Sequence, residues 1–206
     1  MVAPQAAGAG RCRSVLTELL ATLDPVSTQA DAASLIEEFG SLSAVLSAPR
    51  SALGRVAGQT VADALCAVRD AMLHVARAEA FEGPVISSSE ALLKYLQLDM
   101  ATEPVERFRV LFLDAQNRLL YETVADGSIK QAPVYPREVM RRALQVGATA
   151  LILVHNHPSG DPSPSRSDIE MTRRIIDAGR ELDVTVHDHL VVARTGWTSF
   201  RARGLL

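Results

Sequence analysis

A short apolar run between two helical segments sets the strongest limit on how this 206-residue chain can fold. The run is TALILV (149–154), and its almost wholly apolar character is typical of a strand buried on both faces of a sheet. The segments PREVMRRALQVG (136–147) and DIEMTRRIIDAGREL (168–182) flank it, and each spaces its apolar residues as one face of a helix does. A buried strand between two helices predicts an α/β arrangement.

Three further segments complete the predicted sheet. FRVLFLD (108–114) and RLLYETV (118–124) favour two strands joined by a short polar turn, and VTVHDHLVVA (184–193) favours another strand. Because strands alternate with helices in this part of the chain, we expect a mixed sheet covered by helices over residues 83–206.

The first part of the chain is predicted to be helical throughout. Between residues 13 and 82, the segments VLTELLATL, ADAASLIEEFG and VADALCAVRDAMLHVARAEAF place apolar residues three and four positions apart. Residues 1–12 are predicted to form a flexible tail. A break at EGP (82–84) separates the two parts, and a capping-box pattern from Ser87 to Glu90 begins the next helix.

Composition excludes several classes of protein. The formal net charge of -3 argues against a protein that binds nucleic acid through bulk charge. Cys12 and Cys66 lie far apart, which argues against a disulfide framework or a cysteine-rich zinc site. The first ten residues lack the continuous apolar core of a signal peptide. The sequence also lacks an apolar run of about 18 residues, the length that a membrane span needs, so we expect a cytoplasmic protein.

Four of the five histidines fall in two H-x-H pairs, His155/His157 and His187/His189. Residues two apart on a strand point to the same side, so such a pair can hold one ion. The first pair follows the buried strand directly, where the backbone is rigid. The second pair has several interpretations: a separate metal site, a role near the first pair such as the orientation of its rings, or a purely structural role.

Asp168 is the predicted third ligand beside His155 and His157. The pattern Ser165-x-x-Asp168 is a helix N-cap, which places Asp168 in the first turn of the helix that follows. The loop before it is rich in proline and glycine and can return this helix start to the histidines at little entropic cost. Catalytic zinc sites use three nitrogen or oxygen ligands and leave a fourth position for water. The sequence therefore predicts a zinc site with Ser165 beside it as a hydrogen-bond donor.

These four residues lie at the spacings of a known motif, H-x-H followed by seven residues, Ser, two residues and Asp. The pattern resembles the JAMM metalloprotease motif. The longer string HNHPSGDPSPSRSD, with Thr172 and the pair Asp188-His189 after it, is similar to the bacterial RadC family. The resemblance implies a cytidine-deaminase-like JAMM/MPN domain with a mixed sheet over residues 83–206. It also implies a small all-α, helix-hairpin-helix-like domain over residues 13–82.

The resemblance further implies a zinc-dependent hydrolase that acts on a peptide or isopeptide bond of a protein or peptide substrate. In such an enzyme His155, His157 and Asp168 bind Zn²⁺, and Ser165 helps to hold the oxyanion of the tetrahedral intermediate. Zinc makes water a nucleophile near neutral pH, and a donor aimed at the developing oxyanion is worth about 3 kcal/mol.

A carboxylate must also carry the proton from water to the leaving amine. In JAMM enzymes this base is a glutamate on a strand upstream of the first histidine. Glu106, just before the strand at 108–114, is the predicted base, and its rivals are Glu103, Glu122 and Glu138.

The same resemblance suggests a turn that binds a DNA phosphate in the helical part. Gly58 matches the first glycine of such a Gly-x-Gly turn, but Thr60 replaces the second, and a β-branched residue resists the positive φ that glycine permits. Gln59 occupies the usual apolar position. We therefore favour a packing or partner-docking role for this turn. The alternative is a DNA-repair-associated protein that binds DNA, with a structural or nucleolytic metal site, and a third possibility is an inactive scaffold.

Overall fold

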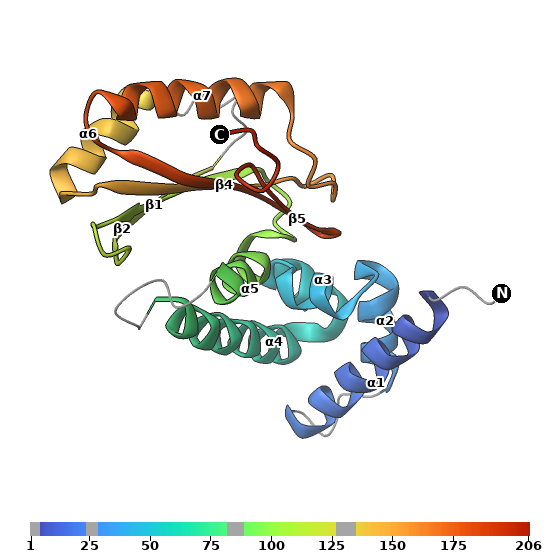
Figure 1. Ribbon diagram of the computed structural model, residues 1–206. Coiled ribbons are helices and arrows are strands. Elements are labelled where there is room, and N and C mark those ends of the chain that lie inside the picture. The colour runs from blue at the N-terminus through green and yellow to red at the C-terminus, as the bar shows by residue number, and fades with distance from the viewer. Residues whose placement is uncertain (1–4, 24–28, 82–88, 127–134) are drawn as a thin grey trace. The chain divides into compact units, whose positions relative to one another are not determined.

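The computed structural model describes residues 5–23, 29–81, 89–126 and 135–206 (Figure 1). The chain divides into two compact units, residues 1–74 and 75–206. No helix within the described ranges is both long and apolar enough to cross a membrane.

The first unit is helical, as predicted. Its elements are α1 (Gln5–Leu23), α2 (Gln29–Phe39), α3 (Leu42–Ser47) and the first part of α4 (Arg50–Phe81). Leucine side chains from each of these helices or the turns between them pack into one buried cluster that includes Leu16, Leu20, Leu35, Leu53 and Leu65. Residues 5–12, which were predicted to belong to a flexible tail over residues 1–12, are part of α1, and residues 1–4 lie outside the described residues. The short α3, capped by Ser41, was not predicted because six residues show no period.

Helix α4 is interrupted at Gly58, within the predicted turn. Gly58 has φ 81° and ψ 165°, outside the helical region, while the residues on either side are helical. A positive φ of this size favours glycine, so the first glycine of the predicted turn has a conformational reason to be there.

The second unit is built on a five-stranded mixed sheet in the order β2-β1-β3-β4-β5. Only β3 and β4 run parallel, and the other neighbours are antiparallel. The elements are α5 (Ser89–Met100), β1 (Arg107–Leu113), β2 (Leu119–Asp126), α6 (Pro136–Val146), β3 (Ala150–Asn156), α7 (Arg166–Arg180), β4 (Thr185–Ala193) and β5 (Gly196–Ser199). This confirms the predicted α/β class.

Helices cover both faces of this sheet. Helices α6 and α7 lie along one face and α5 along the other (Figure 1). The core under α6 and α7 takes alternate residues of β1 and β3, such as Phe108 and Val110 from β1 and Leu151 and Leu153 from β3. Because side chains alternate, His155 belongs to this same face, and its neighbour Asn156 does not.

The predicted break at 82–84 and the predicted cap Ser87 lie outside the described residues. The boundary between domains at residue 83 therefore stays a prediction. The next helix, α5, begins at Ser89.

Gly179 allows the last turn of α7 to pack against the chain that leads into β4. A Cβ atom at this position would lie 2.3 Å from the carbonyl oxygen of Val184. We expect Gly179→Ala to lower the free energy of unfolding by about 2 kcal/mol, the usual cost of overpacking. Urea unfolding followed by circular dichroism measures this. Asp177→Ala, on the exposed side of the same helix, is the control and should cost no more than about 0.5 kcal/mol; equal losses would contradict the packing argument.

Candidate metal centre

The end of β3 and the start of α7 bring three potential metal ligands together. His155 lies within β3, His157 follows the strand directly, and Asp168 occupies the first turn of α7. His155 and Asp168 are buried, whereas the His157 side chain is 17% exposed. One nitrogen or oxygen atom from each residue lies within 4.8 Å of the others, and the structure gives no second such group among the residues it describes.

The distances between these atoms match the coordination shell of zinc. The two Nε2 atoms of His155 and His157 are 2.9 Å apart, and Oδ2 of Asp168 lies 3.4 Å and 3.5 Å from them. Ligands at zinc–nitrogen and zinc–oxygen distances of about 2.0–2.1 Å in a tetrahedron are about 3.3 Å from one another. Three atoms can thus occupy three corners around one ion and leave the fourth open.

The predicted capping box explains how Asp168 is held. Ser165 is the N-cap of α7, and its Oγ accepts a hydrogen bond of 3.2 Å from the backbone N–H of Asp168. In return, the backbone N–H of Ser165 donates to Oδ2 of Asp168 at 2.7 Å. The same carboxylate oxygen therefore caps the helix and faces the histidines, so the helix start fixes its orientation.

The protonation of His157 follows from its second ring nitrogen. Nδ1 of His157 lies 2.9 Å from the carbonyl oxygen of Asp161. A carbonyl can only accept a hydrogen bond, so Nδ1 carries the hydrogen and Nε2 of the neutral ring presents a lone pair. The loop of residues 158–164 thus serves as more than a spacer, because it supplies the acceptor that orients this ring.

A buried chain of hydrogen bonds sets His155 in the same way. The Thr172 hydroxyl donates to the carbonyl oxygen of Asp168 at 2.6 Å. Its oxygen therefore accepts from Nδ1 of His189 at 2.6 Å, and Nε2 of His189 accepts from Nδ1 of His155 at 2.8 Å. This order leaves the lone pair on Nε2 of His155, since a backbone carbonyl ends the chain.

Two lone pairs and a carboxylate thus converge on one point. A hydrogen bond to Asp168 raises the pKa of His157, burial opposes this, and the negative charge of Glu106 adds to the rise. Burial alone would raise the pKa of the Asp168 carboxyl, but rings of His155 and His157 that carry a proton on Nε2 donate to this carboxylate and hold its pKa well below the usual range. Nitrogen lone pairs 2.9 Å apart repel each other unless positive charge lies between them. The donor set fits a divalent zinc ion.

His189 orients the ring of His155 through the hydrogen bond between them. Burial lowers its pKa well below the usual value, and the electrostatic effect of the neighbouring His155 acts in the same direction. The ring packs against Phe200, with centroids 4.5 Å apart, and is fully buried. A neutral His189 can accept from His155, which is the ring-orienting alternative left open by the sequence.

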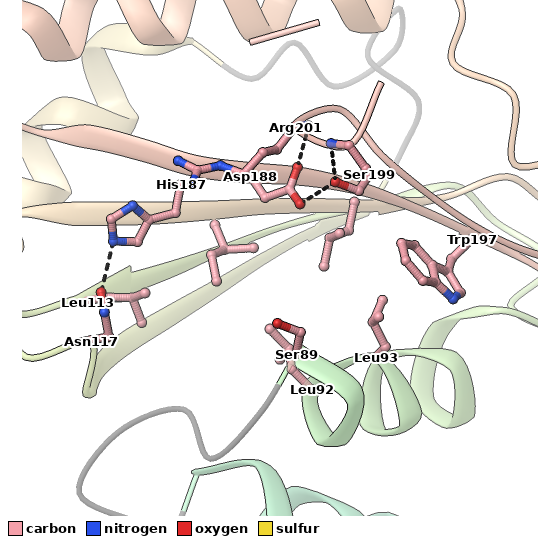
Figure 2. A pocket seen from close by; sticks show the side chains of 13 residues that line it. Ser89, Leu92, Leu93, Leu113, Asn117, His187, Asp188, Trp197, Ser199 and Arg201 are labelled. Carbon is pink, nitrogen blue, oxygen red and sulfur yellow. Dashed lines mark hydrogen bonds between the residues drawn. The ribbon is translucent and has the colours of Figure 1, made fainter. Parts of the chain in front are cut away.

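The predicted second histidine pair does not converge on one ion. The pairing of β3 with β4 shifts between Val186 and Asp188, which leaves His187 as an extra residue in β4. Nε2 of His187 bonds to Oδ1 of Asn117 at 2.8 Å, and His187 lines a pocket of about 410 Å³ beside α5 (Figure 2). This strand irregularity separates the two side chains, and no period in the sequence reveals it.

Asp188 also lines this pocket and has a structural role there (Figure 2). Its Oδ2 accepts from the Ser199 hydroxyl at 2.5 Å, and its Oδ1 accepts from the backbone N–H groups of His189 and Arg201. The carboxylate thereby ties the end of the chain to β4, next to the buried His189.

Three of the four candidate glutamates are paired elsewhere. Glu122 contacts Nη1 of Arg77 at 2.8 Å, and Glu138 contacts Nε of Arg141 at 2.9 Å in the first turn of α6. The carboxylate of Glu103 lies 3.1 Å from Nη1 of Arg107.

Glu106 differs from its three rivals. Among the described residues, it alone of the four has no arginine within ion-pair distance, and it is close enough to His157 to raise the pKa of that ring. It lies directly before β1, as predicted, and is partly buried. This placement favours Glu106 over the other candidates.

Ser165 stands at the exposed rim of the cluster. Its Oγ caps α7 and lies 2.8 Å from Oγ of Ser167. The sequence singled out Ser165 by its spacing from His157 and Asp168.

The hydrogen-bond partners of the two histidine rings were not predicted from the sequence. Thr172 could have been found, because it lies one helical turn after Asp168 and residues four apart share a helix face.

Comparison with known proteins places this arrangement in a family. The family described as RadC-like JAB domain matches residues 86–205. The chain belongs to the RadC family. A UPF0758 protein from Rhodobacter capsulatus is 49% identical to it over 175 residues, which is 84% of this chain and 82% of that protein. The family and its α/β fold were predicted correctly from the motif around His155.

Metal binding by the cluster can be tested with one substitution. Intact protein supplied with zinc and then desalted should hold about one ion per chain, because three ligands converge. His157→Ala removes one ligand and should leave little or none, as measured by elemental analysis. His74→Ala, at a histidine outside the cluster, is the control. Equal zinc in His157→Ala and intact protein would contradict the proposed ligand set.

His189 should matter for metal binding without touching the ion. We expect His189→Ala to weaken zinc binding by about 10–100-fold, the usual effect of removing the partner that orients a histidine ligand. Competition with a chelator of known affinity measures this in the folded protein. His187→Ala, two residues away and facing Asn117, should bind zinc as intact protein does. An unchanged affinity in His189→Ala would show that His155 needs no partner.

Proposed function

We propose that this RadC protein is a zinc-dependent hydrolase of the JAMM type, acting on a peptide or isopeptide bond. The observation that carries this is the convergence of two Nε2 lone pairs and the Asp168 carboxylate, with one side left open at His157. A zinc ion held by three protein ligands makes water a nucleophile near neutral pH and polarises a carbonyl group.

Glu106 is the proposed proton carrier. Its partly buried carboxylate lies close enough to His157, the partly exposed member of the cluster, to raise the pKa of that ring. It can take a proton from the attacking water and give it to the leaving amine, which is the step that hydrolysis of an amide requires. The arginine partners of Glu103, Glu122 and Glu138 hold those carboxylates in ion pairs instead.

Ser165 is the proposed donor to the oxyanion. Its oxygen already accepts from the backbone N–H of Asp168, so its own hydrogen remains to be donated to another acceptor. In this structure the nearest partner for that hydrogen is Oγ of Ser167. A substrate carbonyl at the exposed rim can take its place, and preorganised donors of this kind stabilise the charge that develops there.

DNA binding through the turn at Gly58 has less support. Nε of Arg50 lies 2.5 Å from Oδ1 of Asp63, and Nε2 of Gln59 also donates to this carboxylate at 2.6 Å. The nearby acid offsets one of the arginines that would meet a phosphate, and the whole chain carries a formal charge of -3. The hydrolase proposal is therefore the one that we favour.

The general base is tested by Glu106→Gln, which keeps the shape of the side chain and removes its charge. We expect zinc content to stay as in intact protein and cleavage to fall by about 10²-fold or more. Because the substrate is not defined, the zinc-loaded protein is incubated with a protein extract. New α-amino and ε-amino groups are then labelled and counted by mass spectrometry. Glu138→Gln, an acid paired with Arg141, is the matched control and should cleave normally.

Two results would count against the proposal. Undiminished cleavage by Glu106→Gln would assign the base to another acid. Cleavage by neither variant nor intact protein, together with normal zinc content and a melting temperature that falls on zinc removal, would favour the inactive scaffold.

A further inference from the structure

Asn156 lies between the two histidines of the candidate site and is fully buried. It is the last residue of β3 and pairs with Val192 of β4. Because side chains alternate along a strand, it points to the opposite side from His155. It is therefore not a ligand, and a buried polar side chain at this position needs another explanation.

The Asn156 amide makes three hydrogen bonds to the backbone before and at the start of β1. Its Oδ1 accepts from the N–H of Arg107 at 2.7 Å. Its Nδ2 donates to the carbonyl oxygens of Glu103 and Val105, at 3.3 Å and 3.1 Å. All three contacts cross about 50 residues of sequence, so the side chain ties residues 103–107 to the end of β3.

The segment held in this way carries Glu106. In the ladder between β1 and β3, Arg109 pairs with Val154, and the last pair is Phe108 with His155. If this antiparallel register is continued by two residues, Glu106 lies opposite His157. At this point the Asn156 side chain replaces the ladder, because it bonds to the backbone on both sides of Glu106.

Only an amide satisfies this arrangement. Its oxygen accepts one hydrogen bond, and its nitrogen donates two. An aspartate offers no donor to the two carbonyl groups, a serine has a single hydrogen to donate, and an alanine leaves all three backbone groups without this partner.

We propose that Asn156 is a positioning residue that holds Glu106 over the metal site by clamping residues 103–107. The inference rests on the proposed role of Glu106 as proton carrier, but its geometric content stands apart from hydrolysis. The residue between the two proposed histidine ligands thus positions the proposed base. The strand end that presents the ligands also sets the distance from ligand to base.

The test measures the position of Glu106 with Co²⁺ in place of zinc, so that it does not depend on turnover. In protein with ¹³C-labelled glutamate, the carboxyl signal of Glu106 should be strongly broadened by the paramagnetic ion. The Glu106→Gln variant identifies this signal. In Asn156→Ala the signal should recover, and the N–H of Arg107 should exchange with solvent at least about tenfold faster, since its acceptor is gone. Affinity for Co²⁺ should stay within about threefold, because no ligand has changed.

Ser199→Ala is the matched control. It also removes a buried hydrogen-bond donor from the sheet, the one to Asp188, and should leave the Glu106 signal and the Arg107 exchange unchanged. Asn156→Ser is the second variant, in case the alanine change unfolds the protein. In the cleavage assay, Asn156→Ala should reduce turnover in intact protein and add nothing to Glu106→Gln, since it acts through that residue.

The outcomes separate the two proposals. The positioning role would be overturned if the Glu106 signal stayed broadened in Asn156→Ala, or if the Arg107 N–H still exchanged slowly. It would also be overturned if Asn156→Ala lost metal as completely as His157→Ala, or if both Asn156 variants failed to fold. Absence of cleavage by intact protein, with the cobalt and exchange results as expected, would overturn the hydrolase proposal and leave the clamp in place.

Discussion

The direction of a few hydrogen bonds that end on backbone carbonyls sets how the rings of the histidine cluster are protonated. The carbonyl oxygens of Asp161 and Asp168 can only accept, so they decide which nitrogen of His157 and, through Thr172 and His189, which nitrogen of His155 carries a hydrogen. Both rings then face the same point with a lone pair. The geometry that would let the cluster hold a metal follows from main-chain groups as much as from the side chains that form it.

The sheet provides the rigidity that this arrangement needs. β3 lies in the middle of five strands, with an antiparallel neighbour on one side and a parallel one on the other. The antiparallel neighbour carries Glu106 to the site, and the parallel neighbour carries His189. The extra residue His187 shifts the register of β4 by one position. Val186, which precedes it, therefore faces the core, and His189, which follows it, faces the same side and meets the histidine cluster. Residues from three separate parts of the sequence thereby surround one position.

Much of this could be predicted from sequence, and the exceptions have physical causes. Long periodic segments gave correct helices and strands, whereas α3 and β5, with six and four residues, are too short to show a period. The spacing from His155 to Asp168 identified the cluster, because one loop and one helix cap join its members. Glu106 was the predicted base from its place before β1, and the ion pairs that set its rivals apart are visible only in the folded chain. No signal in the sequence links Asn156 to residues 103–107, since these contacts arise from strand pairing.

The neutral character of His189 has a consequence for the electronic properties of the site. A histidine ligand usually donates its second N–H to a carboxylate, a carbonyl or water, and an anionic partner makes the ring a stronger electron donor. Here an uncharged imidazole, kept so by burial, accepts from His155. The His155 ring would then pass less electron density to a cation held at this cluster, and the cation would keep more of its power to withdraw electrons. A residue with no contact to the ion would in this way tune its Lewis acidity.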